Sequence, residues 1–152
     1  MTRQIYLLNG PNLDLLGERE PEVYGRYTLA DIEALCRSVT DRHGLGLVAH
    51  QTNAEHEMIH WLHEARQAAG IVINPAAFCY HAVPILDALK MCAGPIVEVH
   101  ISNIYRREDW RSKSILAAAC TGVITGLGID GYRLAMEYLV ATLPKRKSRR
   151  AK

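Results

Sequence analysis

Short, almost continuously apolar runs alternate with longer segments of helical periodicity along this chain. Five such runs occupy residues 5–8, 47–50, 71–73, 96–99 and 122–125. Runs of this kind are typical of strands that are buried on both faces. Between them, apolar residues recur every three or four positions, over 29–39, 58–69 and 83–89, and again over 132–143 before Pro144. The alternation predicts an α/β fold in which helices cover both faces of a five-stranded parallel sheet.

Length and charge predict one domain followed by a basic tail. A chain of 152 residues, 49% of them hydrophobic, can bury one substantial core, and we expect residues 1–144 to form it. Residues 145–152 carry six of the positive charges, so a net charge of +2 becomes 2 − 6 = −4 for the rest of the chain. Such a tail is expected to be solvated and disordered, with weak contact to nucleic acid as the alternative. Because the acidic domain gives that alternative no support, we predict no nucleic-acid partner.

The sequence also indicates where the protein resides. No run of about 18 apolar residues occurs, so we predict no transmembrane helix and no membrane partner. The N-terminal residues lack the layout of a secretory signal, and we therefore expect a cytoplasmic protein. The four cysteines, Cys36, Cys79, Cys92 and Cys120, form no C-x-x-C pair. In such a protein this pattern predicts reduced thiols, with Cys36 and Cys120 packed in the core.

One segment matches a zinc motif. Residues 56–60 read H-E-M-I-H, which fits H-E-x-x-H, a pattern that puts two histidines on one face of a helix. The extended form of the motif needs a third histidine where this chain has Arg66. We therefore interpret the segment as a solvated helix face and predict no metal site, although His56, His60 and His63 could capture stray metal during purification. No phosphate-binding glycine loop occurs, and we predict no cofactor.

Three polar loops are expected to form the functional site. Ligands of open α/β sheets bind beyond the carboxyl ends of the strands, so the segments that follow strands carry the function. Residues 9–25, 74–81 and 98–111 follow the first, third and fourth predicted strands and are rich in polar side chains. We expect all three to converge on one crevice.

The first loop offers a candidate base. It is unusually long for a strand-to-helix connection, as binding loops and lids tend to be. Tyr24 lies in it five residues after Arg19. A neighbouring cation favours the tyrosinate form, which makes Tyr24 a candidate general base; the alternative is an ordinary surface pair.

The third polar loop offers an anion site. His100 and Ser102 alternate along an extended segment and so face the same side. Arg107 and Arg111 have the spacing of one helical face, and two arginines beside Ser102 would hold a carboxylate or phosphate; the alternative is a solvated basic turn. With Asn12, Asn74 and His81 from the other loops, these residues fit proton-transfer chemistry on a small anionic, hydroxylated substrate, without a metal-ligand cluster among them.

Over residues 4–143 the sequence resembles the type II 3-dehydroquinate dehydratases, or type II dehydroquinases. The matching blocks are N-G-P-N-L-D-L-L-G-E-R-E-P-E-V-Y-G, Q-T-N-A-E-H-E-M-I, I-N-P-A-A, E-V-H-I-S-N with R-R-E-D-W-R, and T-G-V-I-T-G-L-G-I-D-G-Y. The resemblance implies a flavodoxin-like fold and a dodecamer built from trimers. It implies trans-elimination of water from 3-dehydroquinate through an enolate to give 3-dehydroshikimate, with no metal and no Schiff base. The reaction serves the shikimate pathway, for aromatic amino acid biosynthesis, or quinate catabolism.

The resemblance also implies roles for individual residues. Tyr24 matches the base that removes the proton beside the ketone, Arg19 matches the lid arginine near it, and Asn12 matches the residue that positions a water on the enolate oxygen. Arg107 matches an arginine near the base, and Asp87 matches an acidic residue presented to a neighbouring subunit's site. The groups expected to hold the hydroxyls and carboxylate of the substrate are Asn74, His100, Arg111 and the backbone of Ile101 and Ser102.

One block departs from the family. Where the family has T-H-T-S, residues 79–82 read C-Y-H-A, and the spacing from Asn74 to Asp87 is unchanged. Tyr80 therefore occupies the place of the general-acid histidine, and His81 follows it. Three interpretations stay open: Tyr80 donates the proton, His81 enters through a rearranged loop, or the chain has diverged. A diverged chain would act on a related cyclic hydroxy-keto acid or would bind a small anion without catalysis.

Overall fold

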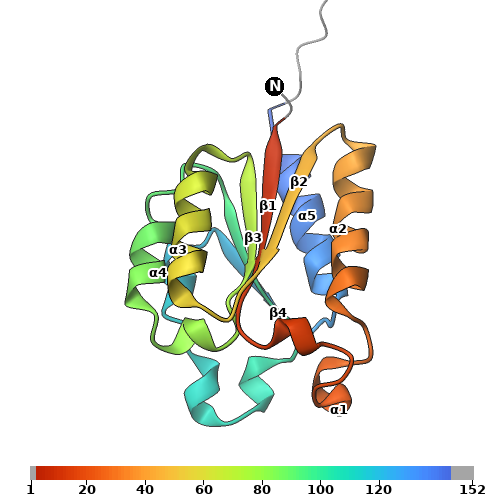
Figure 1. Ribbon diagram of the computed structural model, residues 1–152, viewed down its shortest axis with the longest axis vertical. Coiled ribbons are helices and arrows are strands. Elements are labelled where there is room, and N and C mark those ends of the chain that lie inside the picture. The colour runs from red at the N-terminus through yellow and green to blue at the C-terminus, as the bar shows by residue number, and fades with distance from the viewer. Residues whose placement is uncertain (1–2, 145–152) are drawn as a thin grey trace, which may run out of the picture.

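A computed structural model describes residues 3–144 (Figure 1), and the predicted tail at 145–152 lies outside the described residues. Five parallel strands form one sheet in the order β2-β1-β3-β4-β5. The strands are β1 (Gln4–Asn9), β2 (Gly46–Gln51), β3 (Gly70–Asn74), β4 (Ile96–His100) and β5 (Gly122–Thr125). This is the doubly wound, flavodoxin-like strand order, with its switch point between β1 and β3. The predicted fold class is confirmed.

Two pairs of helices cover the sheet. Helices α2 (Leu29–Arg42) and α5 (Asp130–Thr142) pack on one face, and α3 (Glu55–Glu64) and α4 (Val83–Leu89) pack on the other (Figure 1). The short helix α1 (Pro21–Tyr24) lies in the first polar loop. The periodic segment predicted to run to residue 69 ends earlier, because α3 tightens into a 3₁₀ turn, Ala65–Gln67. Among the described helices, none has both the length and the apolar character needed to cross a membrane.

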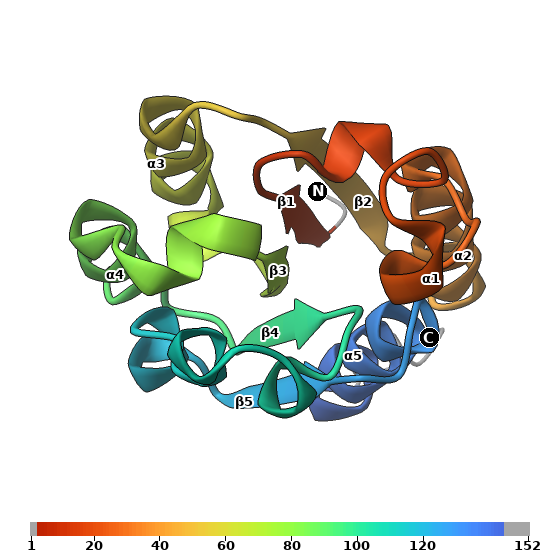
Figure 2. The ribbon, with the colours of Figure 1, turned by 90° about the horizontal axis from the view of Figure 1, so that it is seen from below.

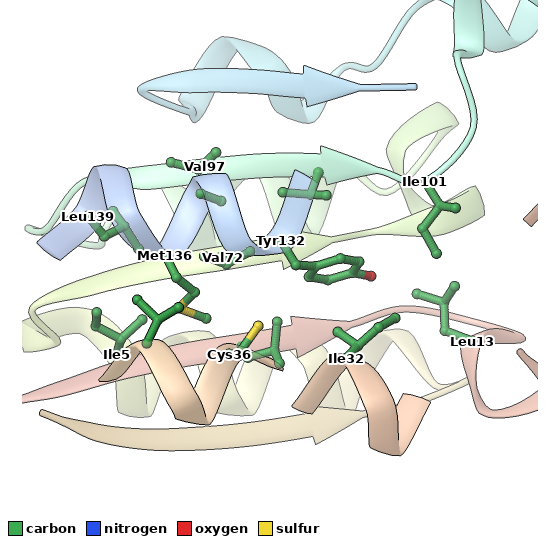
Figure 3. Close-up of a cluster of buried hydrophobic side chains, with 14 of the residues drawn as sticks. Ile5, Leu13, Ile32, Cys36, Val72, Val97, Ile101, Tyr132, Met136 and Leu139 are labelled. Atoms are coloured by element: carbon green, nitrogen blue, oxygen red, sulfur yellow. The ribbon is translucent and has the colours of Figure 1, made fainter. Parts of the chain in front are cut away.

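Alternating side chains of the central strands feed two cores. Leu7 packs with α2 and α5, whereas the next residue, Leu8, packs with α3 and α4, because successive strand residues point to opposite faces. Figure 3 shows the first core, in which Cys36 and Tyr132 are fully buried between α2, α5 and the sheet. The prediction that Cys36 packs in the core is confirmed. Cys120, which was also predicted to do so, is only half-buried.

The edge strands differ from the prediction that every strand is buried on both faces. Strands β1, β3 and β4 are largely buried, but β2 is half-buried along its length and Val123 in β5 is 41% exposed. Each edge strand has a neighbour on one side only, so the covering helices reach it less completely. The apolar pattern alone does not distinguish a central strand from an edge strand.

A capping box fixes the point where the first polar loop ends and α2 begins. The backbone N–H of Thr28 donates to Asp31 Oδ2 at 2.8 Å, and the Asp31 N–H donates to Thr28 Oγ1 at 3.3 Å. The hydrogen bond from the Thr28 backbone is the main cause that lowers the pKa of Asp31 below its usual value. Thr28 and Asp31 therefore anchor the C-terminal end of the loop.

Candidate active site

The segments that follow β1, β3 and β4 lie at the same end of the sheet (Figure 2). A pocket lined by residues of all three polar loops opens there, at the carboxyl ends of the strands. The expected convergence is thus observed. Its polar lining comes from Asn12, Arg19 and Tyr24 of the first loop, Asn74 and Tyr80 of the second, and His100, Ser102, Arg107 and Arg111 of the third. Three guanidinium groups in one small pocket favour an anionic ligand.

The first two loops are joined at Gly10. The Gly10 N–H donates to the carbonyl of Asn74 at 2.8 Å, and a Cβ at Gly10 would lie 2.2 Å from the carbonyl oxygen of Pro75. Asn12 follows in the left-handed region at φ 66°, and its N–H donates to Asn53 Oδ1 at 2.8 Å. Only glycine allows this close approach, so the sequence N-G-P-N fixes where Asn12 enters the pocket.

Tyr24 lies between two arginines. Nη1 of Arg107 donates a hydrogen bond to the Tyr24 hydroxyl oxygen at 2.8 Å, and the Arg19 guanidinium carbon lies 4.8 Å from the centroid of the tyrosine ring. The Arg107 side chain is only 17% exposed, so this contact is partly shielded from water. This charge-assisted hydrogen bond places a positive charge directly beside the phenol oxygen.

Asn74 is held by a buried hydrogen-bond chain. Its Nδ2 donates to the Tyr132 hydroxyl at 2.7 Å, and that hydroxyl donates to Asn9 Oδ1 at 2.8 Å. Asn74 Oδ1 in turn accepts from the N–H of Ala76 at 3.1 Å. Ala76 has φ 48°, a left-handed conformation that favours glycine. Sequence reasoning did not single out Asn9 or Tyr132, whose roles depend on contacts across the sheet.

His100 is paired with a carboxylate that sequence reasoning missed. His100 Nε2 lies 2.5 Å from Glu98 Oε1, and Glu98 is fully buried. Cys120 Sγ lies 3.8 Å from the other carboxylate oxygen. An acidic residue inside the apolar run I-V-E-V-H was the signal that could have identified Glu98, because buried carboxylates are rare unless they are paired.

Cys79 completes a cluster around this pair. The ligand atoms of Cys79, Glu98 and His100 all lie within 4.8 Å of one another. The sequence analysis did not bring these three residues together, because residues far apart in sequence meet where β3 and β4 run side by side. Burial, followed by the charge of Glu98, raises the pKa of the Cys79 thiol to about 12, and the same two causes raise that of Cys120 to about 12.

Tyr80 lines the pocket beside Arg111. The Arg111 guanidinium carbon lies 4.2 Å from the ring centroid of Trp110 and 5.9 Å from that of Tyr80, and the two rings meet edge to face at 5.1 Å. Arg111 Nε also binds Glu108 Oε2 at 2.8 Å. Burial is the largest cause that raises the pKa of Tyr80, and Arg111 opposes it. Tyr80 is therefore a protonated phenol at neutral pH.

His81 takes a different position. Its side chain is exposed, outside the pocket lining, and its ring meets Phe78 edge to face with centroids 6.5 Å apart. Asp87 also lies outside this pocket, on α4, where its side chain is 69% exposed and lies 3.8 Å from Lys90. Neither residue contacts the pocket of its own chain.

Arg107 and Arg111 do not share one helical face, contrary to the prediction from their spacing. Arg107 follows the 3₁₀ turn Ile104–Arg106, and Arg111 lies in the next one, Asp109–Ser112. The backbone is extended at Arg107, which interrupts any helix. Both side chains nevertheless line the same pocket.

The H-E-M-I-H segment lies on α3 as predicted, with His56, His60 and His63 exposed. Glu57 accepts a hydrogen bond from the hydroxyl of Thr52 and so helps to fix the start of α3. Over residues 3–144, His56 and His60 belong to no group of three converging metal ligands. This arrangement agrees with a solvated helix face.

Comparison with known proteins relates the pocket to one family. The sequence profile of the family described as "Dehydroquinase class II" matches residues 3–140. The chain is 52% identical over 139 residues to the 3-dehydroquinate dehydratase of Salinispora arenicola, covering 91% of this chain and 97% of the relative. It is 53% identical over 135 residues to 3-dehydroquinate dehydratase 2 of Agrobacterium fabrum, covering 88% and 92%.

A solved structure agrees with the sequence comparison. The crystal structure of type II dehydroquinase from Propionibacterium acnes superposes with a TM-score of 0.86 at 43% identity, covering 93% of this chain and 98% of that one. Both the sequence and the fold therefore match over nearly the whole of the described residues.

Proposed function

The chain belongs to the class II dehydroquinase family, and we propose that it is a carbon–oxygen lyase that converts 3-dehydroquinate to 3-dehydroshikimate by trans-elimination of water. The observation that carries the proposal is the Tyr24 hydroxyl, which accepts a hydrogen bond from Arg107 at 2.8 Å in a pocket lined by three arginines. A base of this kind beside an anion site is what proton removal next to a ketone on a carboxylate substrate requires.

In the first step Tyr24, as the phenolate, takes the proton from the carbon beside the ketone. The electron pair of the broken C–H bond moves onto the ketone oxygen and gives an enolate. Asn12 holds the water that donates a hydrogen bond to that oxygen. The positive charges of Arg107 and Arg19 lower the free energy of the enolate that forms nearby.

In the second step Tyr80 donates its proton to the departing hydroxyl group, which leaves as water while the enolate collapses to the conjugated ketone. The raised pKa of Tyr80 keeps it in the donor form across the neutral range. A phenol is a weaker acid than an imidazolium, so the elimination is slower than with a histidine at this position. The alternative donor, His81, has to enter the pocket from its exposed position.

The remaining groups orient the substrate. Arg111 pairs with the carboxylate, and its stacking on Trp110 limits its motion. Asn74, His100 and the backbone of Ile101 and Ser102 hold the hydroxyl groups. The carbonyls of Ile101 and Ser102 are already bonded to the Gly128 N–H at 3.1 Å and to Thr125 Oγ1 at 3.0 Å, which supports a rigid binding segment. No cofactor takes part in this scheme.

The proposed enzyme acts as a homo-oligomer, a dodecamer built from trimers, in which Asp87 serves the site of a neighbouring subunit. The exposure of Asp87 outside the pocket of its own chain supports that role, because it leaves the carboxylate accessible to another copy. Large apolar side chains exposed on the surface, such as Val83 at 54%, are consistent with contacts between copies. The cytoplasmic location stays a prediction.

The test follows the ultraviolet absorbance of the conjugated product after addition of 3-dehydroquinate. Tyr24→Phe is expected to reduce kcat by about 10²–10⁴-fold, the range for loss of a general base. Tyr27→Phe is the matched control, since Tyr27 is 56% exposed and lies outside the pocket lining. If Tyr24→Phe turned over like the Tyr27 control, Tyr24 would not be the base.

The identity of the proton donor is tested by comparing the turnover of Tyr80→Phe with that of His81→Ala. Loss of turnover in the first variant and not in the second supports Tyr80, and the reverse result assigns the proton to His81. A folded wild-type protein that gains thermal stability with 3-dehydroquinate but forms no product would refute the lyase assignment and indicate an anion-binding homologue. A wild-type protein that neither binds nor converts it would indicate a related cyclic hydroxy-keto acid as substrate.

A further inference from the structure

The buried cluster beneath the pocket joins three kinds of metal ligand. The cluster joins the Cys79 sulfur, a Glu98 carboxylate oxygen and a His100 ring nitrogen, all within 4.8 Å of one another. They come from two separate segments, the loop after β3 and strand β4. Cys79 and Glu98 are fully buried, and His100 is 5% exposed. His100 lines the pocket, so the cluster has an open side that faces the solvent-accessible site.

The charge balance of the cluster favours a cation. Glu98 is a fully buried carboxylate, and among residues 3–144 its ion-pair partner is His100, with no lysine or arginine within salt-bridge distance. A buried charge is costly unless an opposite charge offsets it, and a carboxylate and a thiolate ligand together carry two negative charges. A divalent cation would supply two charges at the same place.

The donor set selects the type of cation. Thiolate, imidazole and carboxylate are the ligands of Zn²⁺, at about 2.0–2.3 Å, and thiolate excludes hard cations such as Mg²⁺ and Ca²⁺. Around a tetrahedral ion with these bond lengths, ligand atoms lie roughly 3.4–3.8 Å apart. The side chains therefore need shifts of only about 1 Å from the observed spread of 4.8 Å or less.

We propose that Cys79, Glu98 and His100 bind one thiophilic divalent cation of the zinc–cadmium class, and that the bound cation inhibits the enzyme. On binding, the Cys79 thiol releases its proton to solvent, and the proton in the hydrogen bond between His100 and Glu98 leaves for solvent or for the second ring nitrogen. The sulfur, the freed His100 nitrogen and one Glu98 oxygen then bond to the cation. A water from the pocket fills the fourth position. Inhibition follows because His100 shifts toward the cation and no longer lies where it would hold a substrate hydroxyl, and this part rests on the proposed function.

Binding is tested without any activity measurement. The metal-free full-length protein is titrated with CdCl₂ while the ultraviolet cadmium–thiolate band is recorded and bound metal is counted by equilibrium dialysis. We expect the band to saturate at one cadmium per chain. The exposed histidines of α3 can add bound cadmium but cannot produce a sulfur band, so the spectrum separates the two sources.

Cysteine variants identify which cysteine supplies the sulfur ligand of the bound cadmium. Cys79→Ser is expected to abolish the band, whereas Cys92→Ser, at a half-buried cysteine bonded to Leu62 and Ala88, is expected to retain it. Should Cys79→Ser fail to fold, His100→Ala provides the second test, with cadmium affinity at least about tenfold lower than wild type. An unchanged band in Cys79→Ser, or no band in the wild type, would overturn the proposal.

Turnover of 3-dehydroquinate with ZnCl₂ then tests inhibition. Wild-type and Cys92→Ser turnover should fall and recover on addition of a chelator, whereas any turnover of Cys79→Ser should be unaffected by the metal. Equal loss in all three would refute inhibition through this cluster. If the metal-free wild type had no turnover, the proposed function would fail, while the cadmium result would still decide the binding site.

Discussion

Removing the Tyr132 hydroxyl should destabilise the protein and weaken its hold on Asn74. In the fully buried chain Asn74–Tyr132–Asn9, the hydroxyl accepts from Asn74 Nδ2 at 2.7 Å and donates to Asn9 Oδ1 at 2.8 Å. Figure 3 shows the Tyr132 ring inside the core with its hydroxyl directed toward the end of the sheet where Ile101 lies. Tyr132→Phe deletes this one oxygen and leaves the ring in place.

The magnitude follows from the groups left without partners. One buried donor and one buried acceptor lose their hydrogen bonds, at about 1–3 kcal/mol each, or roughly 2–6 kcal/mol together. Because the variant has no hydroxyl to bury, it avoids a desolvation cost of about 1–3 kcal/mol, which offsets part of the loss. Asn9 Nδ2 already lacks a hydrogen-bond partner within residues 3–144, so turning the Asn9 amide would only exchange one unpaired group for another. The expected net loss is roughly 2 kcal/mol, or about 4–8 °C in Tm for a domain of this size.

Thermal denaturation of Tyr132→Phe is measured beside Tyr138→Phe, a change on the same helix at a side chain that is 44% exposed. The control should match wild type. Because Tyr132 positions Asn74, its loss should also raise KM for 3-dehydroquinate more than it lowers kcat. A fall in Tm of less than 2 °C, equal to that of the control, would refute the argument that the hydroxyl holds both amides.

Two further predictions concern the first loop and the helix cap that follows it. Gly10→Ala should lower Tm and reduce activity, because the added Cβ would lie 2.2 Å from the Pro75 carbonyl oxygen. An unchanged melting curve would show that the first and second polar loops separate easily. Asp31→Asn should lower Tm at pH 7. Since the folded-state pKa of Asp31 is lowered, the stability from this cap is present above its unfolded pKa and is lost as the pH falls through the folded value, so the two melting curves should converge in acid.

The fold could be predicted because its signals are local. A strand run such as 71–73 and the helical spacing over 29–39 each depend on near neighbours in sequence, and the strand–helix alternation then restricts the topology. What was missed depends on neighbours across the sheet. Val123 reads as a buried strand residue, yet β5 has a partner on one side only, which the local pattern does not record.

In the site, too, features that depend on local sequence could be predicted, whereas contacts across the sheet could not. The three polar loops could be assigned to one pocket, because the carboxyl ends of parallel strands meet at one edge. The contacts within the pocket could not. Cys79 and His100 meet only because β3 and β4 pair, with Ile71 opposite Ile96, and because a 3₁₀ turn directs Cys79 inward. The spacing of Arg107 and Arg111 suggested a helix that the extended backbone at Arg107 interrupts.

The geometry of the second loop bears on which residue supplies the proton. His81 can enter the pocket only if the 3₁₀ turn Ala76–Tyr80 unwinds, which breaks the hydrogen bonds from the Phe78 N–H to Pro75 at 3.1 Å and from the Ala82 N–H to Phe78 at 3.0 Å. Two backbone hydrogen bonds cost about 1–3 kcal/mol, and moving the buried Phe78 adds to that. At 1.4 kcal/mol per factor of ten, such a conformation is populated at roughly ten percent or less. Tyr80 needs no rearrangement. The Tyr80 phenol is the weaker acid but is always in the pocket, so it competes with His81, whose imidazolium is the stronger acid but seldom reaches the pocket.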